Sequence, residues 1–160
     1  MAAPKQIPET FLQIKRTIAA PREKVYQAWT DREKLERWMC RDQPTHEVKY
    51  RALDVRPGGR YQIEVKAPGG DVHLGEGEYR EVKPPEKLVF TWGWRKLAGK
   101  PEDLNAPEYT LVTVEFFERG KSTEVVLTHE YLPNERSRQE HEAGWIGCFD
   151  VLENHLKHSG

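Results

Sequence analysis

“HEAGWIGCFDVLENHL”, residues 141–156, repeats its apolar residues with the period of an α-helix. Extended back to Asn134, a residue type that favours helix N-caps, the pattern predicts a helix of about 33 Å. A helix of this kind must bury its apolar face against another layer. That face is one continuous arc, which holds Gly144, His155, Cys148, His141, Leu152, Trp145, Leu156 and Phe149.

The preceding sequence predicts a sheet as that second layer. Residues 11–18 alternate apolar and polar side chains, as in a half-buried strand, and residues 20–39 have the spacing of two short helices. From Glu47 onward, about six strand patterns follow one another through turns, including a type II turn at Pro57 and Gly58. The order predicts an α+β domain with an antiparallel meander and a long last helix.

Composition narrows the class of protein. The chain has 160 residues, with 25 basic and 26 acidic side chains interspersed, which argues against binding to nucleic acid or an anionic membrane. No apolar run reaches the ~20 residues of a membrane span. Cys40 and Cys148 lie far apart without a CxxC motif, so we expect a cytoplasmic protein with free thiols. We expect one domain over residues 10–157 with flexible tails at 1–9 and 158–160.

Strand parity predicts which side chains face the long helix. Large aromatic rings dominate these inward positions, together with one histidine. The three inward sets are Leu88, Phe90, Trp92 and Trp94; Tyr61, Ile63 and Val65; and Val125, Leu127, His129 and Tyr131. The interior is therefore expected to be aromatic, with a few polar atoms at the ends of its tyrosine, tryptophan and histidine side chains.

The cysteine and histidines of the long helix do not form a catalytic pair. His141 and Cys148 share a face, but seven residues of rise separate them by about 10 Å, whereas a nucleophile and its base need ~3 Å. A base for Cys148 would have to come from another element, and His129 is the first candidate. If the protein is an enzyme, the catalytic candidates are therefore His129, His141 and Cys148.

No motif in the sequence indicates a metal-binding or a phosphate-binding site. The histidine and glutamate at the start of the long helix do not form an HExxH motif, and no glycine-rich segment has phosphate-loop spacing. His46, Glu47 and His73 lack metal-ligand spacing, and we expect them at the surface. The sequence therefore predicts neither a metal nor a cofactor.

Two glycines interrupt the long helix. Gly144 and Gly147 together cost about 2 kcal/mol of helix stability relative to alanine. Either the helix packs closely on the sheet there, or the glycines leave clearance for a ligand. The residues alone leave both interpretations open.

Several segments resemble one known family. The chain is similar to the Hsp90 ATPase activator homologue 1-like proteins of the START/Bet v 1-like (SRPBCC) superfamily, from about Phe11 to Leu156. The matching segments are “RTIAAPREKVYQAWTDREKLERWM”, “DVRPGGRY”, “GEYREVKPPEKLVFTWGW”, “TVEFFERGKSTEVVLTHEYLP” and “HEAGWIGCFDVLENHL”. The resemblance implies a helix-grip fold, in which a curved antiparallel sheet wraps around the C-terminal helix and leaves a cavity between them.

The resemblance also implies where a ligand would lie. The loop 95–108 would lie near the mouth of the cavity. The side chains expected to face or border it are Trp38, Tyr61, Phe90, Trp92, Trp94, His129, His141, Trp145, Cys148, Phe149 and Leu152.

An aromatic-rich cavity with few polar groups is typical of a small-molecule site. We therefore expect a protein that binds a small apolar or aromatic ligand. Two alternatives stay open, an interaction protein for an Hsp90-type chaperone and a cyclase- or aromatase-like enzyme that uses an inward histidine. Because no residue pair has diagnostic catalytic spacing, binding is favoured over catalysis. Ile146 lies on the polar face of the helix, and both a monomer and a homodimer fit the sequence.

Overall fold

The computed structural model describes residues 10–41, 45–96 and 109–157. The predicted tails and most of the predicted loop at the cavity mouth lie outside these residues. The elements are β1 (Leu12–Ile18), α1 (Arg22–Ala28), α2 (Arg32–Trp38), β2 (Glu47–Leu53), β3 (Arg60–Lys66), β4 (Val72–Lys83), β5 (Lys87–Lys96), β6 (Thr110–Arg119), β7 (Ser122–Glu130) and α3 (Glu135–Lys157). The predicted order of elements is confirmed.

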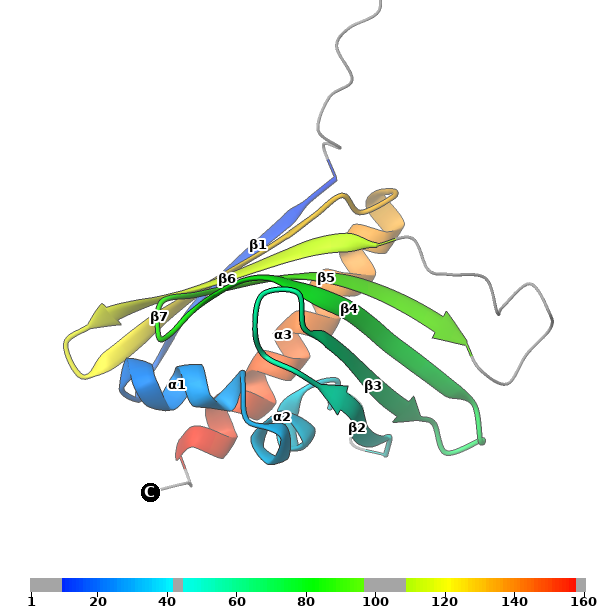
Figure 1. Ribbon diagram of the computed structural model, residues 1–160, viewed down its shortest axis with the longest axis horizontal. Coiled ribbons are helices and arrows are strands. Elements are labelled where there is room, and N and C mark those ends of the chain that lie inside the picture. The colour runs from blue at the N-terminus through cyan, green and yellow to red at the C-terminus, as the bar shows by residue number, and fades with distance from the viewer. Residues whose placement is uncertain (1–9, 42–44, 97–108, 158–160) are drawn as a thin grey trace, which may run out of the picture.

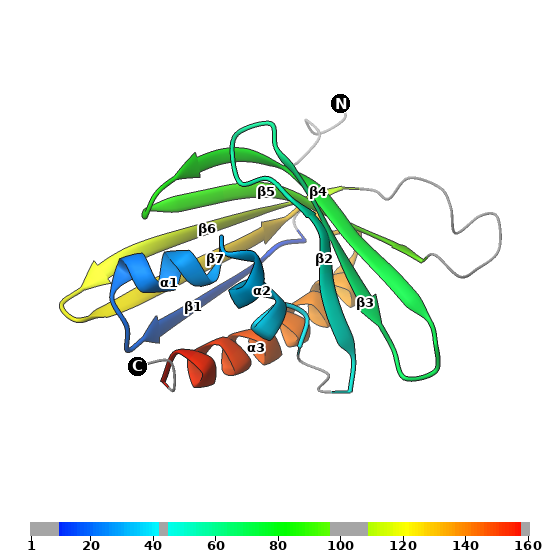
Figure 2. The same ribbon diagram turned by 60° about the horizontal axis from the view of Figure 1, so that its bottom comes forward.

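The strands form one curved sheet that grips α3. Its order is β1-β7-β6-β5-β4-β3-β2, and every neighbouring pair is antiparallel. The sheet arches over α3, while α1 and α2 lie on the same concave side (Figure 1). Seen from below, α3 lies between the β1 edge and the β2–β3 edge (Figure 2). This is the predicted helix-grip fold.

Local capping and turn chemistry explain where the elements begin. Asn134 Oδ1 accepts a hydrogen bond from the Ser137 backbone N–H at 2.8 Å, so the predicted N-cap of α3 is confirmed. Gly58 has a φ of 85°, and the Gly59 N–H donates to the Arg56 carbonyl at 2.8 Å, as the predicted turn requires. No helix in the described ranges has the length and hydropathy of a membrane span.

The inward faces agree with strand parity except at one residue. The predicted inward residues of β3 are buried, as are Val125, Leu127 and His129 of β7. Tyr131 is the exception, because it is 43% exposed. The alternation stops with the end of β7 at Glu130, and Tyr131 takes a φ of 68° that turns the chain toward α3.

Gly77 is a point of close backbone approach between β4 and β5. A Cβ there would lie 2.0 Å from the Thr91 carbonyl oxygen and 2.8 Å from Tyr61 Oη, and these two groups share a hydrogen bond of 2.5 Å. We expect Gly77→Ala to lower the free energy of unfolding by about 2 kcal/mol, because the methyl group must push β5 away or break that bond. Urea denaturation measures the change.

Gly69→Ala is the matched control for this prediction. A Cβ at Gly69 meets nothing within 4 Å, so its substitution should change stability by less than about 0.5 kcal/mol. Equal stability of the two variants would contradict the steric argument at Gly77.

Candidate functional site

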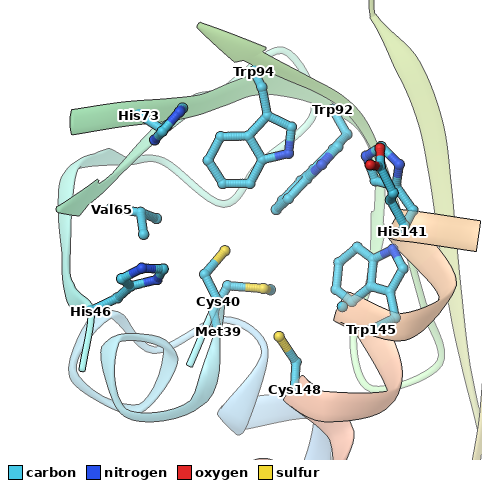
Figure 3. Close-up of a pocket in the computed structure, with 12 residues that line it drawn as sticks. Met39, Cys40, His46, Val65, His73, Trp92, Trp94, His141, Trp145 and Cys148 are labelled. Carbon is cyan, nitrogen blue, oxygen red and sulfur yellow. The ribbon is translucent and has the colours of Figure 1, made fainter. Parts of the chain in front are cut away.

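A pocket of about 360 Å³ lies between the N-terminal half of α3 and the end of the sheet formed by β3, β4 and β5 (Figure 3). Its size falls within the ~300–1,000 Å³ that is usual for small-molecule sites. It is open to solvent on one side, and its wall is mostly apolar. The lining residues are Met39, Cys40, His46, Val65, His73, Trp92, Trp94, Glu140, His141, Gly144, Trp145 and Cys148.

The structure separates the predicted cavity residues into three groups. Five of them line the pocket, namely Trp92, Trp94, His141, Trp145 and Cys148. Tyr61 and Phe90 instead border a second chamber of only about 10 Å³, which Trp92 also borders. The remaining four are fully buried in the core outside both linings, namely Trp38, His129, Phe149 and Leu152. A ligand contact remains a prediction for every one of them.

Two histidines expected at the surface line the pocket instead. His46 and His73 are half-buried and lie on its sheet side, opposite α3 (Figure 3). For His73 the reason is the register of β3 and β4, which pairs it with the inward Val65, whereas His46 lies in the segment just before β2. The expected surface position is confirmed for Glu47, which is exposed, and holds only in part for the two histidines, which are half-buried in the wall of a pocket open to solvent.

The buried His129 connects α3 to three strands. The Trp145 indole N–H donates to His129 Nδ1 at 3.0 Å, and His129 Nε2 lies 2.6 Å from Thr110 Oγ1. The Thr110 hydroxyl donates in turn to the Trp92 carbonyl at 2.9 Å. Because an indole N–H can only donate, Nδ1 carries the lone pair and Nε2 carries the proton. Both ring nitrogens are thus engaged by the protein.

Burial, followed by the neighbouring His141, lowers the pKa of His129 to about 3. His129 is therefore neutral at pH 7, and its proton is fixed on Nε2. The geometry is that of a residue that positions Trp145 and Thr110, since no ring nitrogen is left to exchange a proton with a substrate.

The depressed pKa of His129 predicts how stability depends on pH. The unfolded chain takes up a proton near the ordinary pKa of 6.5, whereas the folded protein does so only near 3. Stability contributed by His129 is thus complete above pH 6.5 and is lost as the pH falls toward 3. We expect this residue alone to cost roughly 2.5 kcal/mol between pH 7 and pH 4.5.

His129→Gln provides the comparison, because an amide offers an acceptor to Trp145 and a donor to Thr110 without titrating. Denaturation at both pH values should show a flatter pH dependence for this variant. The same slope in the variant and the wild type would rule out His129 as the source.

His141 is arranged differently. Its Nδ1 lies 2.8 Å from the Ser137 carbonyl oxygen, so Nδ1–H donates there and Nε2 is the nitrogen left for a ligand. Cys148 is 4% exposed and lies on the same helix two turns further on. Among the described residues, no three His, Cys, Asp or Glu side chains are grouped so that they could hold a metal ion. On the helix side, His141 and Cys148 are therefore the polar groups that the pocket offers to a ligand.

The tryptophan side chains form a continuous row from the core to the pocket. Their ring centroids lie 4.6 Å apart for Trp38–Trp29, 6.2 Å for Trp29–Trp145, 5.3 Å for Trp145–Trp92 and 5.5 Å for Trp92–Trp94. These residues are all five tryptophans of the chain. The aromatic wall of the pocket is therefore supported from behind by packed rings.

The curved sheet, the gripped helix and the pocket between them define a helix-grip protein. The sequence model of the Activator of Hsp90 ATPase homolog 1-like protein (AHSA1) family matches residues 19–157, and the chain belongs to this family. Comparison with curated proteins gave no match.

Solved structures show the same fold at low sequence identity. The AHSA1 protein from Silicibacter pomeroyi has a TM-score of 0.78 and 22% identity, over 94% of this chain and 99% of that one. A protein from Chromobacterium violaceum has a TM-score of 0.77 and 24% identity, over 91% and 95%. DynU16, a protein in the dynemicin biosynthetic locus, has a TM-score of 0.70 and 18% identity, over 94% and 48%.

Proposed function

We propose that this protein binds a small apolar or aromatic molecule in the pocket between α3 and strands β3–β5. Gly144 is the observation that carries the proposal. It lines the pocket, and a Cβ at this position would meet nothing within 4 Å. Glycine inside a helix costs about 1 kcal/mol relative to alanine, so α3 gives up stability at a position that faces open space. Of the two interpretations of this glycine, the geometry favours clearance over close packing.

The chemistry of the wall supports the same proposal. Trp92, Trp94 and Trp145 supply aromatic surface, and His141 supplies a polar point among them (Figure 3). A predominantly apolar wall with a few polar groups is the usual composition of a small-molecule site. DynU16, a structural neighbour, comes from a biosynthetic locus, which is consistent with such a role.

Family membership favours a second candidate, an interaction with an Hsp90-type chaperone. This candidate rests on the family's description and on no contact within the pocket. A pull-down with the host's Hsp90, combined with an ATPase assay, distinguishes it from ligand binding. Stimulation of the ATPase by a pocket-blocked variant would show that the two roles are separate.

Gly144→Leu should block the pocket without unfolding the protein. The larger side chain would project from α3 into the open space, and we expect affinity for an uncharged aromatic probe such as N-phenyl-1-naphthylamine to fall at least about tenfold. Probe fluorescence measures the affinity, and native mass spectrometry with an aromatic library extends the test to other compounds.

Ala143→Leu is the matched control, since Ala143 is exposed on the same helix. This variant should keep wild-type affinity. If Gly144→Leu binds the probe as well as Ala143→Leu does, the pocket is not the binding site.

Gly144→Ala tests the clearance itself. Because the added methyl group meets no atom within 4 Å beyond the adjacent residues and backbone of α3 itself, only helix propensity changes, and the free energy of unfolding should rise by about 0.5–1 kcal/mol. Urea denaturation measures the gain. A loss of stability instead would mean that the helix packs closely at this position and would remove the main support for the proposal.

A further inference from the structure

Three histidines stand in the pocket wall, on two opposite sides. His46 precedes β2 and His73 lies on β4, so both are on the sheet side, while His141 belongs to α3 on the other side (Figure 3). Histidine is the side chain that ordinarily changes its charge between pH 5 and 8. The wall therefore holds three groups that gain a positive charge on mild acidification.

Few other charged groups lie near these histidines. Glu140 is the one Asp, Glu, Lys or Arg among the described lining residues, and it is exposed at the rim. On the sheet side, Arg41 donates to the His46 backbone carbonyl at 3.3 Å, and Lys96 is the register partner of His73. A positive charge gained by the wall is thus not neutralised by a carboxylate within the described part of the pocket.

The groups that pack against His141 leave it one nitrogen for an added proton. Its Nδ1–H donates to the Ser137 carbonyl, so Nε2 takes up that proton. The His129 ring lies with its centroid 4.9 Å away, and burial keeps the pKa of His129 near 3, so it stays neutral over this range. The thiols of Cys40 and Cys148 complete the titratable groups of the described lining.

An apolar ligand would remove water from these rings. Among the residues that the structure describes, the imidazoles of His46 and His73 have no hydrogen-bond or ion-pair partner, so they depend on water in the open pocket. Loss of that water costs more for an imidazolium than for a neutral imidazole, because burial disfavours the charged form. An uncharged ligand therefore binds more tightly when the three histidines are neutral.

We propose that His46, His73 and His141 form a pH switch that holds an uncharged ligand at neutral pH and releases it below about pH 6. This inference rests on the proposed function and adds the regulation of that same site. Proton uptake gives the mostly apolar wall up to three positive charges, on both sides of the ligand. The tryptophan rings do not titrate, so the charge of the pocket changes while its aromatic surface stays the same.

The test compares two probes that differ in one sulfonate group. N-phenyl-1-naphthylamine is uncharged at pH 5.5 and pH 7.5, and 1-anilinonaphthalene-8-sulfonate is negatively charged at both. Fluorescence titration of the wild type should show that the uncharged probe binds about tenfold more weakly at pH 5.5, because the charged rings resist desolvation. The sulfonate should bind more tightly at pH 5.5, since the positive wall attracts it. Circular dichroism checks that the protein is folded at both pH values.

The variant His46→Gln/His73→Gln/His141→Gln removes the titrating groups and keeps polar side chains. It should bind the uncharged probe with about the same affinity at both pH values. His155→Gln is the matched control, because His155 is a half-buried histidine of α3 outside the pocket lining. This control should keep the wild-type ratio.

A second measurement needs no variant. If the neutral pocket binds the uncharged probe more tightly, binding must by linkage expel protons from the histidines. Calorimetric titration of the wild type at pH 6, in two buffers with different ionisation enthalpies, should therefore show proton release.

Each result bears on one of the two proposals. Equal affinity of the wild type for the uncharged probe at both pH values, the absence of proton release, or weaker binding of both probes at pH 5.5 overturns the switch and leaves ligand binding intact. A pH dependence that the triple variant retains, or that His155→Gln loses, assigns the titrating group elsewhere and overturns the inference as stated. Failure of the wild type to bind either probe at pH 7.5 counts against the proposed function itself.

Discussion

The hydrogen bond from the Trp145 indole to His129 Nδ1 joins the helix to the sheet. Apolar packing holds α3 against the strands, but the hydrophobic effect is non-directional and does not fix how far the helix slides or turns. A directional bond between a helix residue and a strand residue restricts both, as do the contacts of Arg16 on β1 with Asp150 and Glu153 on α3. Through Thr110 the bond continues to the backbone of Trp92, so the helix wall and the sheet wall of the pocket are held by one chain of contacts.

The two halves of α3 have different surroundings. Beyond the anchor, Phe149 and Leu152 are fully buried and belong to the core. On the N-terminal side, His141 and Gly144 line open space. The same apolar arc is therefore core along one half of the helix and pocket wall along the other, because the sheet curves away from α3 at the β3–β5 end (Figure 2).

The periodicity of the sequence predicts the order of elements and the inward faces of α3, β3 and β7, because burial imposes those periods. It does not mark the inward face of β4, because Gly75 and Gly77 occupy inward positions without a side chain, and His73 on the same face was therefore expected at the surface and not in the pocket wall. His46 lies outside any periodic segment, just before β2. The sequence also does not show that both ring nitrogens of His129 are hydrogen-bonded, since the partners Trp145 and Thr110 come from two other elements.

The row of five tryptophans has an optical consequence. Indole rings whose centroids lie 4.6 to 6.2 Å apart exchange excitation energy far faster than they emit light. The tryptophan fluorescence of this protein is therefore a property of the whole row, from Trp38 in the core to Trp94 at the rim. A compound that quenches a ring in the pocket wall therefore also competes for energy absorbed by the neighbouring rings of the row, and it can be detected without an added label.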